Sequence, residues 1–496
     1  MHRDLAALTE GTFDLLVLGG GITGAGIALD AATRGLRVAL IDKGDFAGGT
    51  SSVSSKLVHG GLRYLEHGDF ALVYEAMQER RRLLHNAPHL VWPLRFIIPF
   101  QRGSRVPPWK WRLGLTLYDA LAGRDNLARS RPLGLGELRR EFPGLRSDGL
   151  CGGASYFDGQ MDDARLCIEV LQTAARHGAT LANYVEAVAF EHDSATIDAV
   201  RAVDHVGATE LVVQARQYVN ATGPWVDAVC RLAGDHGGTY LQPTKGVHIV
   251  VADLGLKAAF LLLHPGDGRV LFVIPWLGKT LIGTTDTLTP ATPDALEVQA
   301  EEIAYLLAAY NHYFAPPLGS ADVLGSFAGL RPLIRARSGE PSALSREFRI
   351  FESPSGLVSV AGGKYTTYRH MAELVTDLVA ARLGTRRRCR THDLPLDGTP
   401  SEPWPTFVPR MMSELRRYAL DEASALHLVR RYGRRTADVV AYLNRDSQLA
   451  QHVVAEEPDL QAEFAYQRDH EMAVCYEDFW LRRTRLGLFH SQPSAL

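Results

Sequence analysis

Short apolar runs and a helical pattern alternate at the start of the chain. An apolar run over 13–18 leads into a glycine-rich turn at 19–24. A helical pattern rich in alanine follows, and a second apolar run over 38–41 ends at Asp42. Short apolar runs bounded by glycine are typical of buried strands. This order predicts a strand, a helix and a second strand of one parallel sheet.

Longer helical patterns appear further along the chain. Apolar residues recur at helical spacing over 70–84, and again over 166–174, after an acidic pair at Asp162 and Asp163. Alternating patterns predict strands over 185–220 and 245–290, with a tight turn at Leu277 and Gly278. The arginine-rich region 407–490 has helical periodicity. Residues 386–406 hold prolines and an arginine cluster and are expected to be a linker.

The glycines of the first turn match a dinucleotide-binding pattern. Gly19 permits the tight turn, Gly21 lets a pyrophosphate approach the backbone, and Gly24 lets helix and strand pack closely. The helix N-terminus offers unpaired N–H groups to the phosphates, and Asp42 can accept hydrogen bonds from a ribose. The strand, turn, helix and acid together predict a dinucleotide site, against the alternative of a plain glycine-rich turn.

Two later turns favour FAD over NAD. A predicted strand ends at Asn220 and is followed by Ala221, Thr222 and Gly223, which can return the chain to the same nucleotide. The segment 361–367 can add a third pass, with glycines beside hydroxyls and a lysine. Such repeated contacts suit a long, permanently bound FAD, and a second glycine fingerprint for a nicotinamide is lacking.

Composition narrows the remaining classes of protein. The net charge of −3 gives no argument for nucleic acid as a partner. The five cysteines form no C-x-x-C pair, so a disulfide framework, a zinc ribbon or a dithiol centre is not expected, and we predict no metal site. No run approaches the ~18 apolar residues of a membrane span, and the polar N-terminus does not resemble a signal peptide. A cytoplasmic protein is the default.

Several motifs resemble those of one family. They are T-S-S at 50–52, S-S-K-L-V-H-G-G-L-R-Y-L-E at 54–66, D-D-A-R-L at 162–166, A-T-G-P-W at 221–225, K-G-V-H at 245–248, I-G-T-T-D at 282–286, R-P-L at 331–333, G-G-K at 362–364 and D-F-W-L-R-R-T at 478–484. With these motifs, the chain resembles the FAD-dependent, respiratory glycerol-3-phosphate dehydrogenases, within the D-amino-acid-oxidase-like flavoproteins. The resemblance implies oxidation of sn-glycerol 3-phosphate to dihydroxyacetone phosphate, with electrons passing to a membrane quinone.

The same resemblance implies a fold and its division into domains. We expect an α/β protein with a Rossmann-like FAD-binding domain of the glutathione-reductase or D-amino-acid-oxidase type, an α+β substrate domain and a C-terminal helical cap. The FAD-binding domain would be discontinuous, from 1–90, 150–230 and 350–385. The substrate domain would comprise 91–149 and 231–349, and the cap 407–496. The cap helices could pair with a second copy in a homodimer or cover their own chain.

The resemblance also supplies site residues. Thr50, Ser51, Ser52, Gly363 and Thr366 would contact FAD. Arginines suit a phosphate dianion because the planar guanidinium donates two parallel hydrogen bonds. The phosphate candidates, with their neighbours in the pocket, are Arg63, Arg331, Arg346, Tyr64 and Thr367.

A base must take the proton of the substrate's secondary hydroxyl. His248 lies in a predicted strand, on the face of Val250, and an imidazole near its usual pKa of ~6.5 suits this role. The alternative is a histidine that is hydrogen-bonded within the core. Lys364 is the second candidate for the proton, or would stabilise negative charge on the reduced flavin. Asp162 and Asp163 are expected to cap a helix and not to catalyse.

Contact with a quinone requires contact with lipid. Aromatic and cationic residues are interleaved over 91–118, including Trp109, Lys110, Trp111 and Arg112. This mixture is typical of a segment in the headgroup region, and predicts peripheral attachment to the inner face of the cell membrane. A buried segment between domains is the alternative. An oxidase that reduces oxygen and a flavin-binding scaffold without turnover also stay open as functions.

Overall fold

The first domain is built on a parallel sheet. The computed structural model describes residues 1–194, 196–235, 237–289, 293–335 and 348–490. The strands follow the order β17 (Phe348–Glu352), β18 (Val358–Gly362), β10 (Thr209–Asn220), β1 (Phe13–Leu18), β2 (Val38–Ile41) and β7 (Thr180–Ala182). All neighbours are parallel except β17, which runs antiparallel to β18. Their carboxyl ends therefore meet at one edge, where ligands of such sheets bind.

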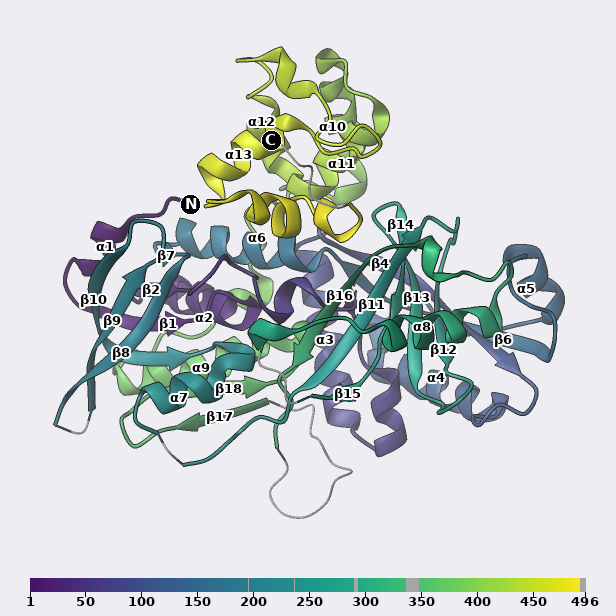
Figure 1. Cartoon of the computed structure of the whole chain (residues 1–496), viewed down its shortest axis with the longest axis horizontal. Coiled ribbons are helices and arrows are strands. Elements are labelled where there is room, and N and C mark those ends of the chain that lie inside the picture. The colour runs from purple at the N-terminus through teal and green to yellow at the C-terminus, as the bar shows by residue number, and fades with distance from the viewer. Residues whose placement is uncertain (195, 236, 290–292, 336–347, 491–496) are drawn as a thin grey trace.

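Helices and a β-meander cover the two faces of this sheet (Figure 1). The helices α2 (Ile22–Thr33), α6 (Asp163–Arg176) and α9 (Tyr368–Arg382) share one apolar core with β1 and β2. On the other face, β8 (Val185–Asp193), β9 (Thr196–Asp204) and the first half of β10 form the meander, next to α1 (Leu5–Thr9). The predicted strand–helix–strand unit over 13–42 is confirmed.

The second domain has a large, mostly antiparallel sheet. Its order is β15 (Thr287–Leu288), β11 (Thr244–Ala252), β14 (Lys279–Gly283), β13 (Val270–Trp276), β12 (Ala259–Leu263), β4 (Val91–Gln101), β6 (Leu150–Met161) and β3 (Leu57–Val58). The strand β16 (Val323–Arg331) pairs with β11, and β5 (Arg131–Leu133) with β6. One core lies under α3 (Phe70–Asn86) and α4 (Pro108–Ala122), and another under α5 (Leu135–Glu141) and α8 (Ala300–Tyr313).

The C-terminal region forms a helical domain with its own core. It contains α10 (Trp404–Leu415), α11 (Glu422–Tyr432), α12 (Thr436–Val440), α13 (Gln461–His470) and a π-helical segment, Asp478–Arg483. The domain stands on α6 of the first domain, on the side of the molecule away from α4 (Figure 1). Between them, the segment 386–406 packs against the first domain, where Leu396 is buried.

The prediction of a lipid-facing segment over 91–118 is wrong for its first part. Residues 91–101 are β4, an interior strand between β12 and β6. Phe96, Ile97 and Ile98 are buried on its two faces. Their pattern, apolar on both faces, is that of a strand covered by helices on either side. The exposed large apolar side chains of this segment lie on α4, where Trp109 and Leu113 are exposed by 66% and 62%.

Candidate functional site

A large cavity lies where the carboxyl ends of β1, β2, β10 and β18 face the second domain. Its volume is about 1090 Å³, above the ~300–1,000 Å³ of most small-molecule pockets. A smaller cavity of about 300 Å³ adjoins it and shares the lining residues Ser55, Leu57, His59, Tyr64 and Arg331. The molecule thus has one long site with a small chamber at its side.

The glycine turn forms one wall of the large cavity. A Cβ atom at Gly24 would lie 1.9 Å from the carbonyl oxygen of Gly19, and one at Gly19 would lie 2.7 Å from that of Ala221. The turns after β1 and β10 therefore touch, and α2 starts directly at the cavity with Gly21 as its N-cap. The cavity is lined by Gly19, Gly21, Ala221, Thr222 and Gly223. Gly24 does not line it, but allows α2 to pack closely against the backbone of Gly19.

The loops that follow β2 line the next part of the large cavity. Asp42 accepts hydrogen bonds from the N–H groups of Gly20 (2.6 Å) and Gly44 (2.9 Å), and burial raises its pKa to about 6. Ser51 lines the cavity, but its Oγ already accepts the N–H of Ile22 at 2.9 Å.

The other two hydroxyls predicted in these loops bond to the protein. Thr50 lines the cavity and donates its hydroxyl to Leu330, while Ser52 donates to Gly49 and is not among the lining residues.

The segment after β18 forms the third wall. Gly363 has φ +83°, and a Cβ atom there would lie 2.4 Å from Met371 Sδ. The adjacent Lys364 lines the cavity and places Nζ 3.6 Å from the centre of the Tyr64 ring. Thr366 lines it too, and its Oγ1 accepts the N–H of His59 at 3.3 Å. Thr367, predicted to contact substrate, is buried, donates to Lys364 and is not among the residues that line either cavity.

His248 lies on β11 at the junction of the first two domains. Its ring stacks on Phe327, and its Nε2 is 2.9 Å from Ser55 Oγ. Burial, together with the positive charges of Arg331 and Lys56, lowers the pKa of His248 to about 3. The prediction of an imidazole near its usual pKa is therefore wrong for the protein without ligands, in which His248 is neutral at pH 7. Ser55, its partner, was missed because nothing in the sequence indicates that 55 and 248 meet.

Arg331, the last residue of β16, lines both cavities. Its Nη1 donates to Asp286 at 3.0 Å and its Nη2 to Thr284 Oγ1 at 2.9 Å. Gly246 on the neighbouring strand leaves room for it, since a Cβ atom there would lie 2.4 Å from Nη2. The guanidinium is thus held where the two cavities adjoin.

The structure is silent on two other predicted phosphate ligands. Arg346 lies outside the described residues, and of Arg63 only the backbone is described, in the 3₁₀ segment Leu62–His67. The next residue, Tyr64, lines both cavities.

Buried charges lie behind the site, and sequence reasoning missed them. Asp162 caps α6, as predicted, by accepting the N–H of Arg165. Asp163, in contrast, pairs with Lys56 at 2.7 Å and Arg485 at 3.1 Å, all three fully buried. Burial and the nearby Arg485 lower the pKa of Lys56 to about 7, although Asp163 opposes this. The cationic and acidic residue types were visible in the sequence, but the pairing of Lys56, Asp163 and Arg485 from three distant segments of the chain was not.

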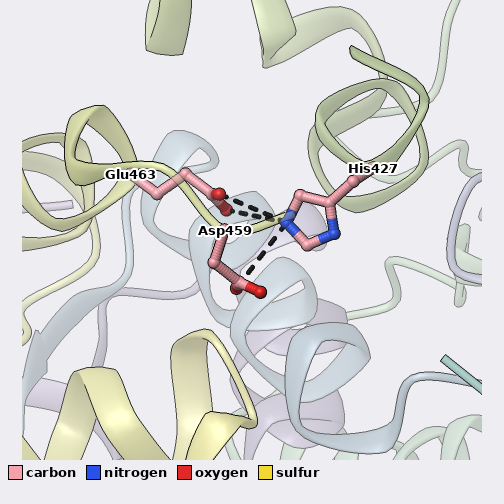
Figure 2. Close-up of side chains that lie close together, drawn as sticks. All are labelled: His427, Asp459 and Glu463. Carbon is pink, nitrogen blue, oxygen red and sulfur yellow. Dashed lines mark hydrogen bonds and ion pairs between the residues drawn. The ribbon is translucent and has the colours of Figure 1, made fainter. Parts of the chain in front are cut away.

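Three potential metal ligands also meet in the C-terminal domain. His427, Asp459 and Glu463 point toward one another (Figure 2), with ligand atoms within 4.8 Å. However, Arg431 donates to both carboxylates, to Glu463 at 2.8 Å. The Arg431 guanidinium thus offsets one of the two negative charges, and the arrangement is that of an ion-pair network.

Comparisons with known proteins agree with this geometry. Residues 14–378 match the family model "FAD dependent oxidoreductase", and residues 389–495 match "C-terminal domain of alpha-glycerophosphate oxidase". The aerobic glycerol-3-phosphate dehydrogenase of Bacillus subtilis is 39% identical, over 97% of this chain and 88% of its own. That of Staphylococcus saprophyticus is 38% identical, over 96% and 87%.

Solved structures agree as well. The glycerol-3-phosphate dehydrogenase from Bacillus halodurans, complexed with FAD, has a TM-score of 0.82 at 34% identity, over 98% of this chain and 88% of its own. An L-alpha-glycerophosphate oxidase from Mycoplasma pneumoniae shares the fold, with a TM-score of 0.60 at 18% identity, over 77% and 97%. FAD fits the large cavity, because its glycine turns leave backbone close to the ligand space and α2 points its N-terminus there.

Proposed function

Because the chain belongs to the FAD-dependent oxidoreductases, among the glycerol-3-phosphate dehydrogenases, we propose that it oxidises sn-glycerol 3-phosphate to dihydroxyacetone phosphate and passes the electrons to a membrane quinone. The observation that carries the proposal is the small chamber beside the FAD cavity: Arg331 and Ser55 line both, and His248, in the wall of the large cavity, is bonded to Ser55. Bound FAD supplies the hydride acceptor. The side chains of the protein bind the phosphate and accept the proton of the substrate hydroxyl.

Arg331 binds the phosphate in this proposal. Its guanidinium is fixed by Asp286 and Thr284, so little side-chain entropy is lost when a dianion arrives. Arg63, on the neighbouring loop, is the second phosphate candidate, and Arg346 the third. Lys364, close to Tyr64, adds positive charge on the side of the FAD cavity.

His248 takes the proton of the substrate hydroxyl at Nε2, the atom that Ser55 holds. An imidazole with a pKa of about 3 is a weak base, but Arg331 is one of the causes of that low value. A phosphate dianion paired with Arg331 offsets this charge, so substrate binding raises the pKa of His248 and makes it a better base. Lys364 is the alternative proton acceptor.

The test is anaerobic loss of the flavin's visible absorption after adding substrate. We expect rapid loss with glycerol 3-phosphate, a far slower loss with glycerol, which lacks the phosphate, and none with lactate. His248→Asn should slow the rate constant for the loss while leaving the substrate affinity nearly unchanged. If glycerol 3-phosphate leaves the flavin oxidised, the proposed reaction is wrong. If the Asn variant reacts as fast as the wild type, His248 is not the base.

A face of the second domain supports contact with lipid. Trp109 and Leu113 on α4, and Phe70 and Tyr74 on α3, are exposed large apolar side chains, and the two helices pack together. Arg112 on α4 is exposed beside them. Both helices also pack against the segment Leu62–His67, which borders the substrate chamber. Among the described residues, no helix is both long enough and apolar enough to cross a bilayer.

This face is tested by sedimentation with anionic vesicles. Trp109→Ala with Leu113→Ala should reduce the bound fraction, and Arg112→Glu should reduce it more at low salt than at high salt. Val212→Ala, at an exposed apolar position on the meander, is the matched control. Wild-type binding by the α4 variants would remove this face from the proposal.

Transfer of the electrons to oxygen is the second candidate, because the C-terminal region matches a model named for an oxidase. Peroxide formation and reduction of a soluble quinone are measured in one assay at equal substrate. We expect quinone reduction to exceed peroxide formation. The reverse ratio would assign the oxidase activity instead.

A further inference from the structure

Two arginines of the C-terminal domain reach a loop of the FAD cavity. In the segment Asp478–Arg483, Arg482 places Nε 2.5 Å from Asp45 Oδ2. Arg483 forms a two-pronged pair with the same carboxylate, at 2.9 and 3.0 Å. Asp45 belongs to the loop that follows β2, and Arg482 itself lines the cavity. A domain that stands on α6 (Figure 1) thus contributes a side chain to the cofactor site.

This contact is buried and charged. The side chains of Asp45 and Arg483 are fully buried, and that of Arg482 is 13% exposed. Burial favours the neutral acid, but Arg483 and Arg482 hold the pKa of Asp45 below its usual value. Arg482 also pairs with Asp478 at 2.7 Å, and Arg483 lies 3.6 Å from Glu471. Loss of Asp45 or of one arginine would therefore leave the buried charges only partly compensated, which is unfavourable. The contact therefore fixes the loop in one position.

The position of that loop decides the shape of the cavity. Asp42 and Gly44, at its start, line the cavity and are joined by a hydrogen bond of 2.9 Å. Ala47, further along, donates its N–H to Gly20 in the glycine turn at 3.1 Å. Movement of Asp45 would shift the carboxylate predicted to hold the ribose and the turn predicted to hold the phosphates.

A third arginine holds the next loop. Arg485 donates to the carbonyl oxygen of Ser52 at 2.7 Å and to Asp163 at 3.1 Å. Ser52 ends the 3₁₀ segment Thr50–Ser52, whose first two residues line the cavity. One short stretch, 482–485, therefore anchors both loops that follow β2.

We propose that residues 482–485 are part of the FAD site: Arg482 faces the cofactor, while Arg483 and Arg485 are positioning residues for the two loops. By thermodynamic linkage, FAD binding and docking of the C-terminal domain then stabilise each other by the same amount. The proposal depends on FAD binding and not on the identity of the substrate, so it can fail or hold independently of the reaction.

The first test is the FAD dissociation constant of the full-length apoprotein, by titration without substrate. Arg483→Met and Asp45→Asn should each weaken binding at least about tenfold, which corresponds to about 1.4 kcal/mol. The double variant should weaken it by less than the product of the two, because both changes remove one interaction. Arg410→Met is the control, since Arg410 pairs with Glu402 on the exposed side of the same domain.

The second test is trypsin cleavage within the arginine-rich segment 386–406. FAD should slow cleavage of the wild type. A higher FAD concentration should be needed to slow cleavage of Arg483→Met to the same extent. If Asp45→Asn fails to fold, Arg482→Lys keeps the charge and removes the planar fork, with weaker FAD binding again expected. Folded variants that bind FAD as tightly as the wild type would overturn the proposal. Absence of FAD protection in the wild type would also overturn it.

Discussion

Replacement of Arg331 by methionine tests phosphate recognition most directly. The side chain keeps a similar length but loses the guanidinium, whose Nη1 and Nη2 already serve Asp286 and Thr284 at 3.0 and 2.9 Å. The guanidinium is a cation that attracts a phosphate dianion, and one charge-assisted contact of this type is worth about 1.5–3 kcal/mol. The side chain is 23% exposed, so the lower half of this range applies.

The expected result is a weaker apparent affinity with nearly constant turnover. A loss of about 1.5–2 kcal/mol raises KM about 10- to 30-fold. Because the phosphate contact is the same in the ground and transition states, kcat should change little. Steady-state kinetics with an artificial acceptor measures both constants, and Arg216→Met, at an exposed pair with Asp14, is the control.

The substrate provides the second half of the test. With glycerol, which has no phosphate, Arg331→Met should not lower kcat/KM by more than about threefold, because the phosphate contact is missing in both proteins. An equal loss of kcat/KM with both substrates would show that Arg331 acts on the site by a route other than contact with the phosphate. An unchanged KM for glycerol 3-phosphate would refute the assignment.

Three further predictions concern the scaffold of the site. Gly24→Ala should abolish FAD binding, since the new Cβ atom would lie 1.9 Å from a backbone oxygen; Gly136→Ala, on α5 and outside both cavities, whose Cβ atom meets nothing within 4 Å, should bind FAD normally in the same titration. The folded protein keeps His248 neutral down to a pKa of about 3, whereas the unfolded chain takes up this proton near 6.5. The free energy of unfolding should therefore fall as the pH drops from 6.5 toward 3, and His248→Asn should lessen the fall; equal pH dependence would contradict this. Asp163→Asn should lower the free energy of unfolding by about 3–5 kcal/mol in urea, because two buried cations lose their partner, and a loss below ~1 kcal/mol would argue against the network.

The FAD-binding domain was predicted from local patterns in the sequence. The turn from Gly19 to Gly24 and the acid at Asp42 lie within one strand–helix–strand unit, whose geometry follows from short-range backbone constraints. The face of His248 followed from the alternation along β11 in the same way. Nothing local distinguished β4 from a surface segment, because its burial depends on β6 and β12, which come later in the chain.

The sequence by itself thus determined the cofactor class, the family and the residue types that the chemistry needs. The tertiary structure decided how these residues behave: burial and two cations shift the pKa of His248, and Ser55 holds its ring. It also decided that Arg482, more than 400 residues after Asp45, lines the same cavity. Charge pairing and desolvation depend on distances in space, and those are fixed only when the domains pack together.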